Sequence, residues 1–268
     1  MTAAPDVLVI IPSYGHFDYV RNTIRSLEHC RAISKYAIDY VIIDDASDEW
    51  DSIDWQTWPS PDCRRYHFDK RAGLTRSWNA GLYLASEISA RYAVCANSDI
   101  VFSPMWEEPL IAALEAGFSL VGPVTNAPGH ATWQSVYPFT CHAAVSQVDD
   151  SKGSIDAIAA ALRDLPLSAI EAPLNGFFMM AQTNVWWRGS FDKMTVFNPQ
   201  FPLAHNEQEL QQRWATLKLR VAFVPRSYIF HYRSVSRPNG LDQSLAVGAY
   251  RRLSLHPDGV MAGRSDGE

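Results

Sequence analysis

Three clusters of polar residues follow apolar runs of the chain, and their side chains suit a charged ligand. Pro12-Ser13-Tyr14 follow VLVII, Asp44-Asp45 follow YVII, and Asn97-Ser98-Asp99 follow YAVCA. Carboxylate and carbonyl oxygens are the ligands that hard divalent cations prefer, and such cations commonly bridge phosphates. Asp, Asn and Ser are also common in turns, so a single cluster would carry little weight. Three clusters in succession predict a crevice that binds a diphosphate and a metal ion.

The apolar runs before these clusters are short and rich in β-branched residues, which is typical of buried strands. Apolar residues at helical spacing separate them, beginning after Asp18, which we expect to cap a helix. Alternating strands and helices predict a parallel sheet, whose ligands bind outside the carboxyl ends of the strands. The predicted strands are 7–11, 40–43, 63–68, 92–96 and 118–121, and the predicted helices are the one after Asp18, 74–88 and one from Pro104 to about residue 116.

The second half of the chain has a different texture. Residues 124–150 are rich in Thr, Asn, Gly, His and aromatic residues and show no clear period. Farther on, the pattern predicts helices at 151–165 and 207–217, an apolar segment at 176–181, and strands at 220–224 and 228–231. We therefore predict one domain over residues 1–236, with a nucleotide-binding half (1–122) and an acceptor-binding half (123–236). Residues 237–268 are predicted to form a partly mobile C-terminal extension.

Composition excludes several classes of protein. The chain has 268 residues, is 47% hydrophobic and carries a net charge of −6, so it is long enough for a large core and shows no basic patch for general nucleic-acid binding. The four cysteines are widely spaced, without a CxxC pair, which favours reduced thiols in a cytoplasmic protein. We find neither a secretory signal nor an apolar run long enough to span a membrane. The oligomeric state stays open.

Seven segments together resemble a known family. They are VLVIIPSYGHFDYVRNTIRSL, YVIIDDAS, DKRAGLTRSWNAGL, ANSDI, NGFFMM, FNPQFPLAHNEQELQQRW and IFHYRSVS. In this order, over about residues 6–236, they resemble the family 2 glycosyltransferases of the GT-A fold. The resemblance implies a Rossmann-like three-layer α/β/α sandwich with a mainly parallel mixed sheet. It also implies metal-dependent, inverting transfer of a sugar from a nucleoside-diphosphate sugar, commonly UDP-linked, to an acceptor hydroxyl.

The resemblance also assigns the residues that bind the donor. The ends of the first two strands and the RAG stretch would hold the nucleoside, with one of the paired aspartates accepting a hydrogen bond from the base. Asn79 of the Asn-x-Gly pattern and Ser98 complete the donor set, and Asn175-Gly176 would lie beneath the sugar. Trp78 stands where the family usually has Arg, and we expect it to be a buried helix residue. The nucleoside residues are Pro12, Ser13, Tyr14, Asp44, Asp45, Arg71 and Gly73.

The metal and the proton acceptor follow from the same resemblance. Asp99 would bind Mn²⁺ or Mg²⁺, with His231 as a further ligand of the metal or the diphosphate. Asn97 replaces the first acid of the family's DxD motif, which removes one negative charge and offers a carbonyl oxygen instead. Glu207, placed by the ELQQR helix that follows, would be the catalytic base, with Glu209 as the alternative.

Other functions stay open. A nucleotidyltransferase shares such a core, although PSYGHFDY lacks the Gly-rich, basic loop that grips a triphosphate. A non-catalytic module that binds a sugar nucleotide would explain the changes at Asn97 and Glu207. The acceptor could be a glycan, a lipid-linked sugar, a small molecule, a protein or a modified nucleic acid. Trp133, Trp186 and Trp187 are candidate sugar platforms, although core packing explains most tryptophans.

Overall fold

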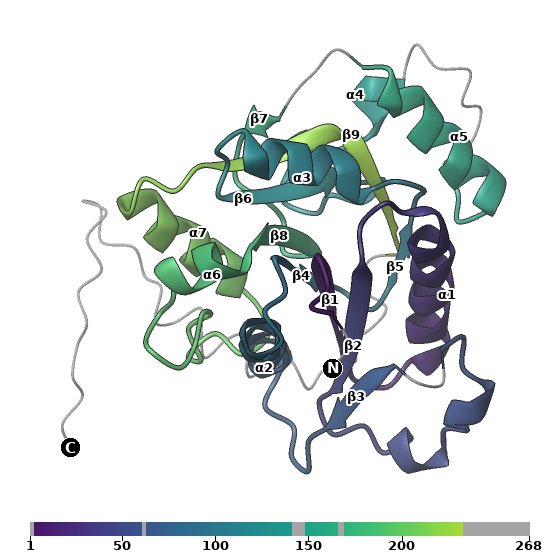
Figure 1. Ribbon diagram of the computed structural model, residues 1–268, viewed down its shortest axis with the longest axis vertical. Coiled ribbons are helices and arrows are strands. Elements are labelled where there is room, and N and C mark those ends of the chain that lie inside the picture. The colour runs from purple at the N-terminus through teal and green to yellow at the C-terminus, as the bar shows by residue number, and fades with distance from the viewer. Residues whose placement is uncertain (1–2, 61–62, 141–147, 166–168, 233–268) are drawn as a thin grey trace.

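The computed structural model describes residues 3–60, 63–140, 148–165 and 169–232, and in these ranges the chain folds around one nine-stranded sheet (Figure 1). The strand order is β3-β2-β1-β4-β8-β6-β9-β5, with β7 paired to β9. The strands are β1 (Val7–Ser13), β2 (Ile38–Asp44), β3 (Arg64–His67), β4 (Tyr92–Ala96), β5 (Ile100–Phe102), β6 (Leu120–Val124), β7 (Ile170–Glu171), β8 (Phe178–Gln182) and β9 (Val221–His231).

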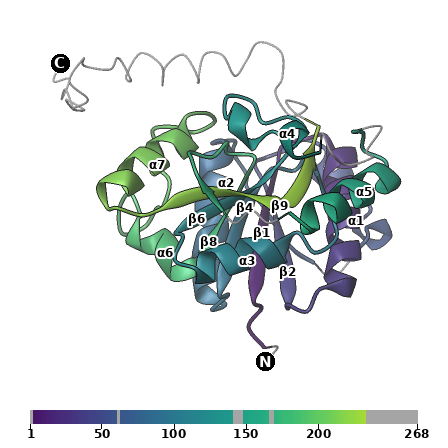
Figure 2. The ribbon, with the colours of Figure 1, turned by 90° about the horizontal axis from the view of Figure 1, so that it is seen from above.

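Seven α-helices lie in the described ranges. They are α1 (Phe17–Ile33), α2 (Leu74–Glu87), α3 (Glu107–Glu115), α4 (Tyr137–Thr140), α5 (Lys152–Arg163), α6 (Thr183–Arg188) and α7 (Asn206–Thr216). Short 3₁₀ turns η1 (Trp50–Ser52), η2 (Trp55–Thr57) and η3 (Thr132–Gln134) join the elements. Seen from above, helices lie on both sides of the sheet (Figure 2), which gives the expected α/β/α sandwich.

The sheet is mixed, with its parallel part at the N-terminal end of the chain. β1 pairs in parallel with both β2 and β4, and β2 with β3, whereas β8 runs antiparallel to both β4 and β6. The carboxyl ends of the four parallel strands therefore lie at one edge of the sheet. This edge carries the polar clusters that the sequence places after the strands.

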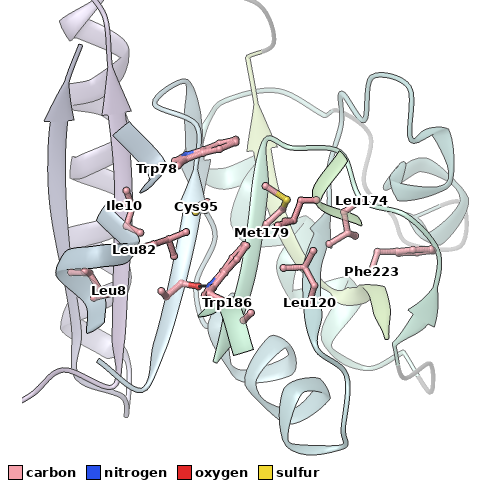
Figure 3. Packing of buried hydrophobic residues seen from close by; sticks show 14 of the residues in the cluster. Leu8, Ile10, Trp78, Leu82, Cys95, Leu120, Leu174, Met179, Trp186 and Phe223 are labelled. Atoms are coloured by element: carbon pink, nitrogen blue, oxygen red, sulfur yellow. Dashed lines mark hydrogen bonds between the residues drawn. The ribbon is translucent and has the colours of Figure 1, made fainter. Parts of the chain in front are cut away.

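Two hydrophobic clusters fill the space between the layers. Because side chains alternate along a strand, Val9 belongs to the cluster beneath α1 and α3, whereas Leu8 and Ile10 belong to the cluster beneath α2. Figure 3 shows the second cluster, in which Trp78 and Leu82 of α2 face the strands. Trp78 is buried, as predicted. A Cβ on Gly81 would lie 2.2 Å from Ile10 Cγ2, so this glycine allows α2 to approach β1 closely.

Some predicted elements differ in detail. α1 begins after His16, a left-handed residue, so Asp18 lies in the first helical turn and is not the cap. α3 begins at Glu107 and not at Pro104, because Met105 adopts a left-handed conformation that breaks the helix. The two strands predicted at 220–224 and 228–231 form one strand, β9, whose register with β6 shifts between Pro123 and Val124.

No helix within the described ranges is long and apolar enough to cross a membrane. Cys30, Cys63 and Cys95 are free thiols, and burial raises the pKa of each above its ordinary value. Cys141 lies outside the described residues, as does the predicted extension at 237–268. Both predicted halves contribute strands to the one sheet, and their boundary at residue 122 stays a prediction.

Candidate active site

Asp44 lies at the end of β2 and is fully buried. Its Oδ1 accepts hydrogen bonds from Ser13 Oγ at 2.8 Å and from Ser47 Oγ at 2.5 Å. Its Oδ2 accepts from the Ser47 backbone N–H at 2.7 Å and lies 2.9 Å from His67 Nδ1. Both oxygens are therefore engaged within the protein. The geometry favours a structural role for Asp44, which joins the ends of β1, β2 and β3. Neither of its oxygens stays unengaged to accept a hydrogen bond from a nucleobase.

Asp45 holds the RAG stretch in the same way. Its carboxylate accepts from the backbone N–H of Ala72 at 3.0 Å and of Gly73 at 2.6 Å, and it pairs with Arg76 Nη2 at 2.6 Å. Gly73 has a φ of 96°, and a Cβ there would lie 2.5 Å from the carbonyl oxygen of Pro202. Only glycine fits this backbone approach without strain. Asp45 thus fixes the RAG loop, which the family resemblance predicts to close over the nucleobase.

Tyr14 and Arg71 come together at the predicted nucleoside site. The Arg71 guanidinium carbon lies 3.8 Å from the centre of the Tyr14 ring, in cation–π contact. Both side chains are partly exposed, and Gly15 N–H, next in the chain, donates to Ser47 Oγ at 2.7 Å. Pro12 and Ser13 are buried within β1. An aromatic ring and a planar cation together suit stacking on a nucleobase. Among the predicted nucleoside-binding residues, Tyr14 and Arg71 are the ones that a ligand can contact through an exposed side chain.

Asn79 has a different setting from the one predicted. Its side-chain oxygen accepts from the backbone N–H of Val196 at 3.0 Å and of Phe197 at 2.9 Å, and its amide donates to the Phe197 carbonyl at 3.0 Å. The side chain is buried against this backbone. The contacts therefore favour a structural role for Asn79, which ties α2 to the segment before α7.

The Asn97-Ser98-Asp99 turn meets His231 at the end of β9. Asp99 Oδ1 lies 3.4 Å from His231 Nε2, and Asn97 Nδ2 lies 3.4 Å from the same nitrogen. Thr23 Oγ1 of α1 donates to the Ser98 carbonyl at 2.8 Å and so fixes the turn. Residues more than 130 positions apart are thus brought together, as the resemblance predicts.

His231 is held in one orientation. The two backbone groups of His231 pair with the amide of Asn126, at 2.8 and 3.1 Å. The ring stacks on Phe177 with centroids 5.1 Å apart, and its Nδ1 lies 3.3 Å from the Ala127 carbonyl. A carbonyl accepts only, so Nδ1 carries the proton and Nε2 carries a lone pair, which accepts from the Asn97 amide and which a cation would use in place of that contact.

The residues around Nε2 fit a divalent cation. Asp99 Oδ1 is buried and has no hydrogen-bond donor among the described residues, since His231 is within ion-pair distance only. A buried carboxylate oxygen without a donor is costly unless a cation balances it. Within the described ranges no three His, Cys, Asp or Glu side chains form a complete metal cage. Asp99 and His231 would therefore supply part of the coordination, with the remaining positions open to Asn97, water and diphosphate oxygens.

Glu207 and Glu209 differ sharply in their surroundings. Glu209 is buried and forms a two-point ion pair with Arg213, at 3.0 and 3.1 Å. The Glu207 carboxylate is partly exposed and has no hydrogen-bond or ion-pair partner among the described residues. It follows His205, a left-handed residue at the start of α7. Of the two glutamates predicted for the base, the geometry favours Glu207.

The segment Asn175-Gly176-Phe177 links Glu207, the predicted catalytic base, to the candidate metal ligands. A Cβ on Gly176 would lie 3.1 Å from Glu207 Cγ and Cδ, so the Glu207 side chain packs directly against this glycine. The next residue, Phe177, stacks on His231, and its carbonyl accepts from the Asn97 backbone N–H at 2.8 Å. Glu207 and His231 therefore contact two consecutive residues, Gly176 and Phe177.

Sequence reasoning missed the residues that position this site. Ser47 and His67 bind Asp44, Arg76 binds Asp45, and Asn126 holds His231. Arg76 was open to prediction, because it follows the RAG stretch on the first turn of α2 and can reach back to a carboxylate. Nothing in the sequence near Asn126 indicates its partner, which lies 105 residues away.

The comparisons with known proteins agree with this architecture. Residues 8–144 of the 268, just over half of the chain, match the profile of Glycosyl transferase family 2. The chain belongs to this family. No curated protein sequence matches it significantly.

Three solved structures share the fold at low sequence identity. GalNAc-T7 with UDP, GalNAc and Mn²⁺ is 14% identical, with a TM-score of 0.58 over 85% of this chain and 43% of that one. The mannosyltransferase PcManGT from Pyrobaculum calidifontis, with GDP-Man and Mn²⁺, is 14% identical, with a TM-score of 0.54 over 92% of this chain and 61% of that one. TarS from S. aureus in complex with UDP is 13% identical, with a TM-score of 0.54 over 84% and 60%. The chain thus spans about two fifths to three fifths of these structures, and the likeness shows a GT-A fold.

Proposed function

We propose that the protein is a metal-dependent, inverting glycosyltransferase, which moves a sugar from a nucleoside-diphosphate sugar to an acceptor hydroxyl. The observation that carries the proposal is the placement of the Glu207 carboxylate, which has no partner in the part of the chain that the structure describes, next to Gly176. The next residue, Phe177, stacks on His231, which lies beside Asp99. A proton acceptor and a candidate cation site are thus set side by side at the ligand edge of the sheet. Family membership supports the same reaction class.

The reaction needs one proton acceptor and one charge stabiliser. The acceptor oxygen attacks the anomeric carbon as its proton passes to Glu207, and the bond from that carbon to the diphosphate oxygen breaks with inversion. Asp99 and His231 would hold the cation, which when bound stabilises the charge on the departing diphosphate. Tyr14 and Arg71 would hold the base, while Asp45 fixes the loop that carries Arg71. Asn175 and Gly176 would lie beneath the sugar.

A UDP-linked donor is our first choice. Two of the three solved structures named above were determined with UDP, the third with GDP-Man. Two alternatives remain: a nucleotidyltransferase and a non-catalytic module that binds a sugar nucleotide. The Glu207 carboxylate, which no described residue engages, favours the transferase over both, because neither alternative requires a proton acceptor at this position. A cytoplasmic location stays a prediction from the cysteine pattern.

The direct test is the thermal stability of the purified protein with UDP-sugars and GDP-sugars, each with and without Mn²⁺. A ligand that binds only the folded state raises the melting temperature, so one donor should give a Mn²⁺-dependent increase. Asp99→Ala should remove the Mn²⁺-dependent part, whereas Asp164→Ala, an exposed carboxylate after α5, should not. Absence of any nucleotide-dependent increase in folded protein would overturn the proposal.

Turnover separates the enzyme from the binding module. Release of nucleoside diphosphate from the donor that binds should proceed slowly with water alone and faster with the correct acceptor. Donor binding without any release, with water or with an acceptor panel, would favour the non-catalytic alternative.

A further inference from the structure

Trp133 is set apart from the other tryptophans. The chain has nine, all within the described ranges, and Trp133 is the only exposed one, at 42% of its surface. Trp186, which the sequence makes an equal candidate for a sugar platform, is fully buried in the core beneath α6. Trp187 is half-buried and packs on the same core. Core packing therefore explains Trp186 and Trp187 but leaves Trp133 unexplained.

The Trp133 ring is fixed in place although it is exposed. Its indole N–H donates to the Pro173 carbonyl at 2.6 Å. The next residue, Gln134, is fully buried, donates to the Pro123 carbonyl at 3.0 Å and accepts from the Asn175 backbone N–H at 2.6 Å. The ring is thus held through η3 and through its own nitrogen. A preorganised aromatic face binds a ligand without first losing conformational entropy.

Trp133 lies within a short distance of the proposed base. Pro173, its hydrogen-bond partner, is three residues before Gly176, which contacts the Glu207 side chain. Three extended residues span at most about 11 Å. Leu174, between them, is pinned by Gln211 of α7 through both of its backbone groups, at 2.6 and 2.9 Å. A ligand of two sugar rings can therefore reach from Trp133 to Glu207.

The chain segment around Trp133 and the segment that it contacts are polar but carry no acidic or basic residue apart from His130. His130 Nδ1 lies 3.3 Å from Asn175 Nδ2, which places an imidazole and an amide beside the segment that Trp133 contacts. Residues 124–140 and 172–178 contain no Asp, Glu, Lys or Arg. A polyanion would require Lys or Arg here, and an acidic or basic peptide would require opposite charges. A neutral saccharide requires neither, and its hydroxyls suit an amide and an imidazole.

We propose that Trp133 is the stacking platform of an acceptor subsite for a neutral saccharide. The C–H face of one sugar ring lies on the indole, while His130 and Asn175 bind hydroxyls, and the reacting hydroxyl of the neighbouring ring reaches Glu207. The inference rests on the proposed transferase function. It deepens that function by choosing a glycan among the acceptors that the sequence leaves open.

The test measures disaccharide binding by saturation-transfer NMR on the full chain, with UDP and Mn²⁺ present. The probes are maltose, cellobiose, lactose and N,N′-diacetylchitobiose. We expect at least one to receive saturation at its ring C–H protons. Trp133→Ala should weaken its binding by about tenfold or more. Trp133→Phe, which keeps an aromatic face but loses the indole N–H, should retain most of it. Tyr83→Ala removes another exposed aromatic ring, from α2, and should have no effect.

Two outcomes overturn the proposal: none of the four disaccharides binds, or Trp133→Ala binds its disaccharide as well as the unchanged protein. The nucleotide-dependent rise in melting temperature is measured on the same samples. If that rise is absent while the binding of a disaccharide still requires Trp133, the proposed transferase function is wrong and the saccharide subsite stands. If the rise is present and no disaccharide binds, the transferase function stands and the subsite fails.

Discussion

Two pairs of acidic residues in this protein have opposite surroundings. Asp44 and Asp45, at the end of β2, form seven hydrogen bonds or ion pairs with six residues: Ser13, Ser47, His67, Ala72, Gly73 and Arg76. Among the described residues, neither Asp99 Oδ1 nor the Glu207 carboxylate accepts a hydrogen bond, and Asp99 Oδ1 has only His231 within ion-pair distance. The family resemblance assigned a role in the site to all four: Asp44 and Asp45 to the nucleoside, Asp99 to the metal and Glu207 to proton transfer.

The difference separates residues that build the site from residues that act in it. A carboxylate with all its oxygens engaged stabilises a particular backbone arrangement, and here it joins three strand ends and the RAG stretch. A carboxylate that lacks donors keeps its charge and lone pairs for a ligand, a cation or a proton. The comparison therefore predicts that changes in the first pair alter stability, whereas changes in the second pair alter activity.

The largest effect is expected at Glu207. Glu207→Gln keeps the shape of the side chain and removes the proton acceptor, so the transfer rate should fall by about 10²–10⁴-fold. The melting temperature and the nucleotide-dependent increase should stay unchanged, because no described residue depends on this carboxylate. Glu209→Gln is the matched change on the same helix and should reduce stability instead, since it breaks the pair with Arg213. Equal activity losses in both variants would contradict the assignment.

Asp44→Asn should produce the largest loss of stability among these carboxylates. The amide nitrogen would face at least one backbone or hydroxyl donor that now has an acceptor, and a buried unpaired donor costs about 1–3 kcal/mol. Urea unfolding measures this loss. Asp99→Asn is the control, because no described donor faces Asp99 Oδ1, and it should lose no more than about 0.5 kcal/mol of stability. Similar losses in the two variants would remove the distinction between the pairs.

Gly73→Ala tests how tightly Asp45 and Pro202 fix the RAG stretch. Gly117→Ala is its control, because both glycines have a φ of 96°, yet a Cβ on Gly117 would have nothing within 4 Å. The left-handed backbone costs about 1–2 kcal/mol in each variant. The contact with the Pro202 carbonyl should add a further loss of about 1 kcal/mol or more at Gly73, together with weaker nucleotide binding. Equal unfolding free energies for the two variants would show that the RAG stretch can move away from Pro202 without a loss of stability.

The smallest effect concerns Glu107, a buried carboxylate far from the ligand edge. Burial raises the pKa of Glu107 above 4.5, and the hydroxyl of Ser34 opposes this shift by donating to it. Its Oε2 has no partner among the described residues. Because the pKa of Glu107 is higher in the folded protein than in the unfolded chain, protonation of this carboxyl group stabilises the fold. This contribution to the free energy of unfolding is present below pH 4.5 and is lost as pH rises through the pKa of the folded state.

Glu107→Gln should therefore raise the melting temperature by a few degrees at pH 7, about 1 kcal/mol, and leave it almost unchanged near pH 4. Scanning calorimetry at the two pH values measures the difference. An increase of the same size at both pH values would rule out ionisation as its cause. The variant also tests whether a buried carboxylate outside the site can be changed without loss of transfer activity.

Much of the fold could be predicted from local pattern. Continuous apolar runs identify β1, β2 and β4, and helical spacing identifies α2, α5 and α7, because burial imposes these periods directly. The start of α3 could not be predicted, since a left-handed Met105 overrides a proline that favours a helix start. The union of two predicted strands into β9 depends on its pairing with β6, a partner about 100 residues away.

The sequence alone determined the fold class, the family and the identity of the polar clusters, because each follows from residues that are close together in the chain. Tertiary structure decided which of those residues are free to act. Asp44 and Asp99 have the same side chain and both lie near the end of a strand. Their neighbours alone make Asp44 a structural residue and Asp99 a candidate metal ligand. Those neighbours come from distant segments, so the hydrogen bonds that distinguish the two residues form only when the whole sheet is assembled.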